Sequence, residues 1–157
     1  AHPIIAAERC HELIDLAQKR SNGKLLVSTS LIGIDAPPQA IVAAADFLLP
    51  HGNRVYGPDG HYQPAPHGIR LQLARWRASP AYRGQPIVYN EDDHFEFDKP
   101  DNHFVAAVEG GAGWGYFDYR MSRERFEDGF QSLPVDWTIS SKRKRAFFGL
   151  LKEITGS

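Results

Sequence analysis

Four short apolar runs, each followed by a loop and a helical pattern, constrain the fold of this chain more than any other feature. The runs cover residues 24–30, 46–51, 86–91 and 114–119. A helix between two such runs returns the chain in the same direction, which favours a parallel sheet with right-handed crossovers. The runs are mostly apolar on both faces, as is typical of parallel strands. The sequence therefore predicts an α/β fold.

The helical segments are predicted from apolar spacing and from end signals. Apolar residues spaced i, i+3, i+4 and i+7 predict an amphipathic helix over 8–18, which Ser21-Asn22-Gly23 ends. The four helices that follow the strands are predicted from Pro37-Pro38 to Ala45, from Ile69 to before Pro80, from an Asp101 or Asn102 cap through a buried side with Phe104, Val105 and Val108, and from a Ser140 or Ser141 cap to Gly156. The order is one helix followed by four strand–loop–helix units.

Two architectures fit this order, and the spacing of the strands leaves both open. One is a small doubly wound sheet, and the other is the parallel-strand half of a TIM (β/α)8 barrel. The length of 157 residues suits one domain in either case.

Charge and cysteine content exclude several classes of function. The chain has 18 Lys+Arg and 19 Asp+Glu, so its net charge of -1 gives no electrostatic reason to expect nucleic acid or a membrane as a partner. Its single cysteine, Cys10, permits no internal disulfide. The chain begins Ala1-His2-Pro3 and its only methionine is Met121, so we expect translation to start further upstream.

Polar side chains follow each predicted strand. Because the carboxyl ends of parallel strands lie at one edge of a sheet, these residues predict a site there. They are Ser28-Thr29-Ser30, then His51 and Asn53, then Asn90 and Glu91, then Asp118, Tyr119 and Arg120.

Glu91 is the sharpest candidate in this set. Alternation places it on the same face of the third strand as Ile87 and Tyr89, at the last position of the strand. A carboxylate at the mouth of a barrel is placed to act as a nucleophile or general base. The alternative interpretation is an acidic solvated loop, or a structural ion pair with Arg120.

Two further groups of residues suggest ligands. Asp92, Asp93, His94, Glu96 and Asp98 form an acidic cluster that could attract a hard cation, but their spacing does not match a calcium loop, so we assign no metal and no cofactor. Among the aromatic residues, Trp114 is expected in the core, while Trp137 is a candidate to stack on the apolar face of a sugar ring.

Several segments also carry a family resemblance. They are residues 86–94, 104–108, 114–117 and 142–156, together with His2-Pro3-Ile4 and Arg9–Ile14. In these segments the chain resembles the C-terminal half of bacterial (β/α)8 proteins related to cellulase-like glycoside hydrolases, and the resemblance spans nearly the whole chain.

The resemblance implies that the four strands are strands five to eight of a barrel. Glu91 then falls on the position of the nucleophile of a retaining glycosidase, and His51 on the position of a residue that orients the nucleophile or the sugar. Asn53, Asn90, Asp118, Tyr119, Arg120 and Trp137 become candidate substrate-binding residues. The family's stacking tryptophan at the end of strand eight is replaced here by Asp118-Tyr119-Arg120.

A retaining mechanism needs two carboxyl groups, and Asn90-Glu91 is the only Asn-Glu pair in the chain. We therefore expect the acid/base residue on a preceding segment, and residues 1–157 to be the C-terminal part of a larger catalytic domain, inactive alone. The open edges of such a half-barrel would be covered by the upstream half or by a second copy. The alternative is a protein that binds carbohydrate, or another partner, without catalysis.

Overall fold

The computed structural model describes residues 6–33, 35–53, 66–92, 96–116, 139 and 142–156. A 3-10 turn at Ala7–Arg9 leads into helix α1 (Cys10–Arg20). Three strand–helix pairs follow, β1 (Ser30–Leu31) with α2 (Gln39–Ala44), β2 (Leu49–Pro50) with α3 (His67–Arg77), and β3 (Val88–Tyr89) with α4 (His103–Glu109). Strand β4 (Gly113–Trp114) and helix α5 (Lys142–Thr155) complete the order. The predicted α/β class is confirmed.

The strands form two parallel pairs that are joined in the middle. Strand β1 pairs with β2, and β3 pairs with β4. Parallel bridges between Leu48 and Ile87 and between His51 and Glu91 connect β2 to β3. The described strands therefore lie side by side in the order in which they occur in the chain.

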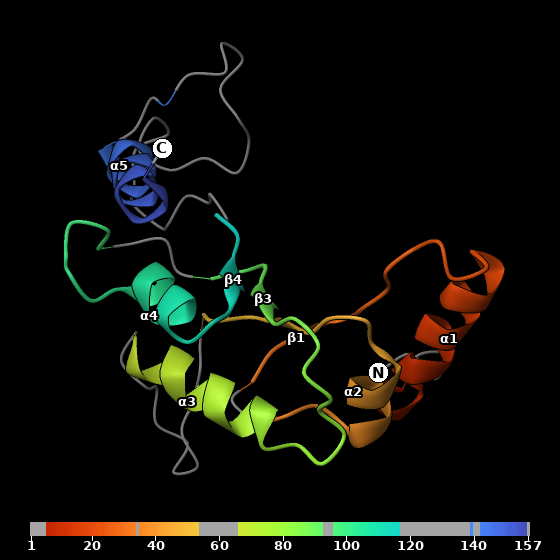
Figure 1. Cartoon of the computed structure of the whole chain (residues 1–157). Helices are drawn as coiled ribbons and strands as arrows, with labels where there is room; N and C mark the ends of the chain where they lie inside the picture. The colour runs from red at the N-terminus through yellow and green to blue at the C-terminus, as the bar shows by residue number, and fades with distance from the viewer. Residues whose placement is uncertain are drawn as a thin grey trace.

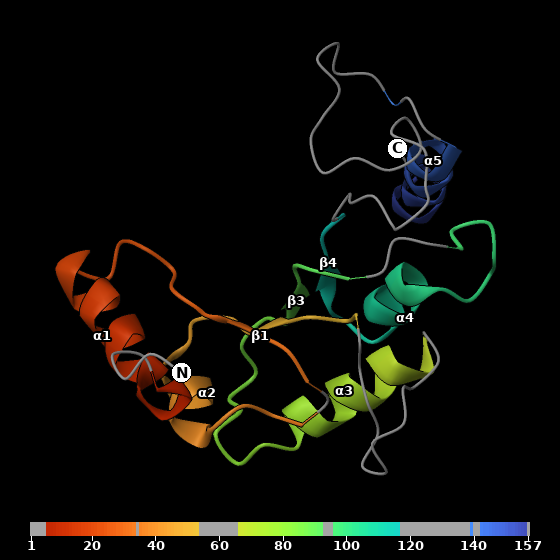
Figure 2. The same cartoon turned by 180° about the vertical axis from the view of Figure 1, so that it is seen from behind.

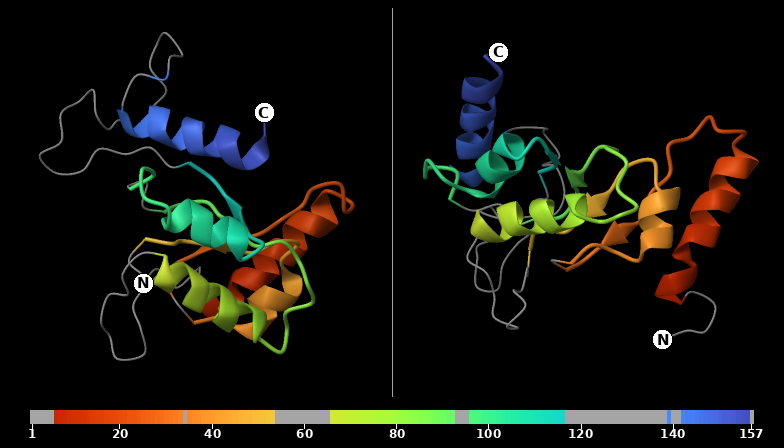
Figure 3. Two further views of the ribbon diagram at one scale, coloured as in Figure 1. Left: turned by 60° about the vertical axis from the view of Figure 1, so that its left-hand side comes forward. Right: turned by 60° about the horizontal axis from the view of Figure 1, so that its bottom comes forward.

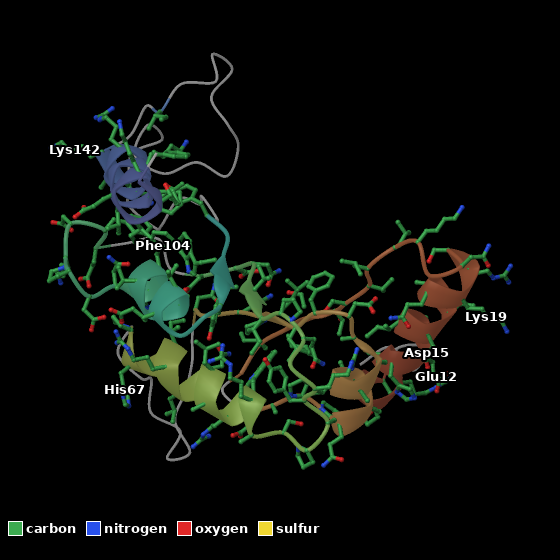
Figure 4. The ribbon with its side chains drawn as sticks, viewed as in Figure 1. Glu12, Asp15, Lys19, His67, Phe104 and Lys142 are labelled. Atoms are coloured by element: carbon green, nitrogen blue, oxygen red, sulfur yellow. The ribbon has the colours of Figure 1, made fainter. Side chains whose placement is uncertain are left out.

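Helices α2, α3 and α4 lie on one side of this row of strands, as Figures 1 and 3 show. Helix α1 packs on α2 beyond the β1 end of the row, and α5 lies beyond the β4 end (Figure 2). Glu12, Asp15 and Lys19 are exposed on α1 (Figure 4), whose buried residue is Ile14. Among the described residues, no helix is long and apolar enough to cross a membrane.

The core has two parts. The larger part lies between the strands and helices α1 to α4 and includes the fully buried Ile41, Ile69, Trp76 and Tyr89. The smaller part is aromatic and joins α4 to α5 through Phe97, Phe104 (labelled in Figure 4) and Phe147, against which Trp114 and Tyr116 pack. Trp114 was expected in the core, and it is partly buried and packs against both parts of it, while its Nε1 donates a hydrogen bond to Asp92.

The predicted first strand is the least accurate part of the prediction. Of residues 24–30, only Ser30 belongs to β1, and Leu25 and Leu26 are 62% and 79% exposed instead of buried. Asp46 holds the segment through its side chain and its backbone: its carboxylate accepts hydrogen bonds from the Val27 N–H and from Gln18, and its N–H donates to the Val27 carbonyl at 3.0 Å. The apolar run predicted burial, but of its apolar residues only Val27 packs partly against the core, while Leu25 and Leu26 are exposed.

Helix α4 begins where its cap predicts but buries a different face. The Asn102 Oδ1 accepts a hydrogen bond from the Val105 N–H at 3.0 Å, so Asn102 is the N-cap. Phe104 is buried as expected, whereas Val105 is only partly buried and Val108 is 38% exposed. The other buried positions are His103, Ala106 and Ala107. His103 is hydrogen-bonded to the buried Asp92, and the two small alanines let the helix approach β4 and α3 closely.

The remaining helices agree with their predicted places. Helix α1 lies two residues later than predicted and ends at the predicted turn, where Asn22 and Gly23 both have positive φ. Helices α2 and α3 lie within their predicted ranges to within two residues. The predicted caps of the last helix, Ser140 and Ser141, and the second half of the fourth predicted strand, residues 117–119, lie outside the described residues.

Candidate functional site

The carboxyl ends of β2 and β3, together with the first residue of β1, bring five polar side chains together. Ser30 begins β1, His51 and Asn53 follow β2, and Asn90 and Glu91 follow β3. The ends meet because the backbone continues the parallel pairing past the strands: the His51 N–H donates to the Leu31 carbonyl, and the Gly52 N–H donates to the Glu91 carbonyl, both at 2.9 Å. The predicted grouping of strand-end residues is thus present for the second and third strands. Of the three residues predicted to end the first strand, only Ser30 joins the group, and it begins β1 instead of ending it.

Glu91 is held through both of its carboxylate oxygens. Its Oε1 accepts a hydrogen bond from the Asn53 amide at 3.1 Å, and its Oε2 lies 3.7 Å from His51 Nδ1. The side chain is 36% exposed, and that of His51 is 18% exposed. The carboxylate is therefore fixed in direction by two neighbours from the adjacent strand while it stays open to solvent.

A second contact runs from His51 to Ser30. The Ser30 Oγ and His51 Nε2 are hydrogen-bonded, and the Asn90 Nδ2 donates to the same Ser30 Oγ at 2.9 Å. Ser30 and Asn90 are exposed. His51 therefore lies between a hydroxyl group on one side and a carboxylate on the other.

The predicted alternation is confirmed for residues 87–90, which separate into a buried and a more exposed face. Ile87 and Tyr89 are buried on the side of the helices, where the Tyr89 hydroxyl donates to the Ile69 carbonyl of α3 at 3.3 Å. Burial, and next the charge of Asp92, raise the pKa of Tyr89 far above its ordinary value, so this hydroxyl keeps its proton. Asn90 lies on the opposite, exposed face with Ser30.

The buried side chain of Gln72 holds the backbone of the site at the end of β2. The Gln72 Nε2, on α3, donates to the His51 carbonyl at 3.0 Å and to the Gly33 carbonyl. Gln72 is fully buried. This amide therefore ties the segments after β1 and β2 to one helix, which fixes the backbone that carries His51.

Asp92, next to Glu91, supports the β3 end in a different way. It is fully buried, its Oδ1 accepts a hydrogen bond from His103 Nδ1, and its Oδ2 accepts one from Trp114 Nε1 at 2.7 Å. Gly52 lies against this carboxylate so closely that a Cβ there would overlap it. The network thus connects β2, β3, β4 and α4 directly behind Glu91.

This network changes the interpretation of the acidic cluster. Asp92 uses both oxygens inside the protein, and Glu96 pairs with Lys99, so neither faces a shared cation. Among the described residues, no group of three or more His, Cys, Asp or Glu could hold a metal ion. Asp93 and His94 lie outside the described residues.

The fourth strand end is not part of the described site. Asp118, Tyr119, Arg120 and Trp137 all lie outside the described residues, so their predicted roles stay predictions. Sequence reasoning named Ser30 as a polar residue at a strand end but gave it no role, and it did not select His103, because nothing in the sequence pairs His103 with Asp92.

The chain was compared with protein-family models, with curated proteins and with solved structures, and none of the three comparisons finds a match.

Proposed function

We propose that this chain is the C-terminal half of a (β/α)8 glycoside hydrolase in which Glu91 is the nucleophile. The observation that carries the proposal is the Glu91 carboxylate, which is partly exposed at the carboxyl edge of parallel strands and is oriented by Asn53 and His51. The resemblance of the sequence to cellulase-like hydrolases points to the same residue.

The strand order supports the half-barrel. In a barrel, strands lie side by side in chain order with the helices on the outside, whereas a doubly wound sheet reverses its order at a switch point. The order β1-β2-β3-β4 has no reversal, and α2, α3 and α4 lie on one side of the strands (Figure 1). The other side, which carries Ser30 and Asn90, then corresponds to the interior of the barrel.

The proposed chemistry is the retaining mechanism. A Glu91 oxygen attacks the anomeric carbon, the bond to the leaving oxygen breaks, and a glycosyl ester forms; water then hydrolyses this ester. A second carboxyl group must protonate the leaving oxygen and later activate the water, at about 5–5.5 Å from the nucleophile. The proposal places this group on a segment that precedes Ala1.

A substrate that needs no acid catalyst tests Glu91 in the chain itself. In 2-deoxy-2-fluoroglycosyl fluorides the fluoride leaves without protonation, and the ring fluorine slows hydrolysis of the ester. We expect gluco-, manno- or xylo-configured reagents to leave one sugar on Glu91, detected by peptide mass spectrometry, and Glu91→Gln to remain unlabelled.

Glu109→Gln is the matched control, because Glu109 is an exposed carboxylate on α4 that pairs with Arg70. This variant should label like the unaltered chain. Labelling of Glu91 and Glu109 to the same extent, or no labelling by any of these sugars, would argue against the nucleophile. Oligosaccharide binding that survives Glu91→Gln without any adduct would favour a binding protein instead.

A further inference from the structure

Ser30, His51 and Glu91 lie in a line across three neighbouring strands. The Ser30 hydroxyl contacts His51 Nε2, and the opposite ring nitrogen, Nδ1, faces Glu91 Oε2 at 3.7 Å. This is the connectivity of a nucleophile, a base and an orienting carboxylate. The 3.7 Å separation is longer than a hydrogen bond, but such contacts are often loose before substrate binds.

The carboxylate favours one position of the proton on the ring of His51. A proton on Nδ1 faces the negative charge of Glu91 and leaves the lone pair of Nε2 directed at Ser30. Another neighbour of the hydroxyl is the Asn90 amide, whose Nδ2 lies 2.9 Å from Ser30 Oγ and whose Oδ1 lies 3.3 Å from it. An amide N–H at this position can donate to an oxyanion that forms beside the nucleophile.

We propose that Ser30, His51 and Glu91 form a serine nucleophile centre that hydrolyses carboxylic esters, an activity separate from the proposed cleavage of glycosidic bonds. Ser30 is exposed, so an acyl group can reach it. It is the first residue of β1, whereas His51 and Glu91 follow β2 and β3, and the parallel pairing of the three strands fixes their relative positions.

The reaction balances with water as the only co-reactant. Ser30 Oγ attacks the acyl carbon while His51 Nε2 takes its proton, and Asn90 donates to the resulting oxyanion. The carbon–oxygen bond to the alcohol then breaks, and the alcohol leaves with the proton from His51. Water next gives a proton to His51 as it attacks the acyl-enzyme; the acid departs and Ser30 recovers its proton.

Diisopropyl fluorophosphate tests the nucleophile directly in the unaltered chain. Ser30 Oγ forms a bond to phosphorus, and fluoride and the hydroxyl proton are released. We expect peptide mass spectrometry to show labelling of Ser30 about 100-fold faster than that of Ser79, the size expected from an adjacent base. Ser79 is a suitable internal reference because it lies in the turn after α3 and has no described histidine contact. Unfolding the chain in urea should abolish the difference between the labelling rates of Ser30 and Ser79.

Variants then assign the roles through hydrolysis of p-nitrophenyl acetate. Ser30→Ala and His51→Ala should lose the activity, Glu91→Gln should reduce it, and Ser79→Ala should retain it, with circular dichroism to confirm that each variant is folded. Equal labelling of Ser30 and Ser79 in the native chain would overturn the proposal without any variant. Because the fluorosugar adduct reports on Glu91 and the phosphoryl adduct on Ser30, failure of one test does not imply failure of the other.

Discussion

Gly52 shows how one residue connects the site to the core. It follows His51, its N–H donates to the Glu91 carbonyl, and its α-carbon lies against the Asp92 carboxyl group. Asp92 cannot move aside cheaply, since it is fully buried and both of its oxygens accept hydrogen bonds from other elements. The absence of a side chain at position 52 therefore allows β2 and β3 to meet at the site.

Gly52→Ala is expected to destabilise the chain by roughly 2–3 kcal/mol, as overpacking a well-packed interior does. The new Cβ would overlap the Asp92 carboxyl group and push apart the strand ends that carry His51 and Glu91. Urea unfolding measures the stability, and fluorosugar labelling measures the effect on the site.

Gly149→Ala is the matched control for this substitution. Gly149 lies within α5 with nothing near its added Cβ, so alanine there should stabilise the helix by up to about 1 kcal/mol. If the two glycine-to-alanine substitutions change the free energy of unfolding in opposite directions, the effect at Gly52 is due to the close approach of Asp92 and not to the loss of a glycine in general. A Gly52→Ala chain as stable as the unaltered one would contradict the packing described here.

At the scale of elements, Asp46 links α1 to the segment before β1. Its Oδ2 accepts hydrogen bonds from the Val27 N–H and from the Gln18 amide, both at 2.8 Å. These bonds, the one from Val27 first, lower the pKa of Asp46 below its ordinary value. A carboxylate with a lowered pKa stabilises the folded state above its unfolded pKa, and this contribution is lost as the pH falls through the folded value.

We therefore expect the Asp46→Asn chain to be less stable than the unaltered chain at pH 6. The difference in their free energies of unfolding should become smaller as the pH is lowered toward 2.5. As the pH falls through the lowered pKa of Asp46, its carboxyl group takes up a proton in the unaltered chain, so the two chains come to carry a neutral group at this position. Urea midpoints at the two pH values measure this difference. A difference of the same size at both would show that the charge of Asp46 does not support the segment.

Local signals were sufficient for the helices and insufficient for the first strand. The Asn102 cap and the turn at Asn22-Gly23 depend on residues within one turn of the helix ends, so the sequence predicts them directly. The burial of Leu25 and Leu26 depends on what covers them from elsewhere, which periodicity does not contain. The site shows the same limit. The sequence predicted that His51 and Glu91 lie at strand ends, but it did not predict the contact between Asp92 and His103, which are 11 residues apart and are brought together by the fold.

At the scale of the whole molecule, the two outer strands each have a neighbour on one side. Strand β1 pairs with β2 and strand β4 with β3, and no further strand pairs with either among the described residues. Beside β1, Leu25, Leu26 and Ile32 are 62%, 79% and 63% exposed. Unpaired backbone groups next to exposed leucine and isoleucine form an edge that another strand can extend.

This edge predicts that the 157-residue chain associates with itself when it is prepared alone, because a second copy offers the same unpaired groups that an upstream half would cover. Sedimentation equilibrium should give a mass above 17.6 kDa that rises with concentration. Leu26→Lys with Ile32→Lys should shift the chain toward monomer, since charges on an edge strand oppose pairing. Val108→Lys, at an exposed position on α4, should leave the association unchanged. A monomer at every concentration would mean that the backbone groups of this edge are already paired within the chain. It would also argue against a separate half of the barrel that covers them.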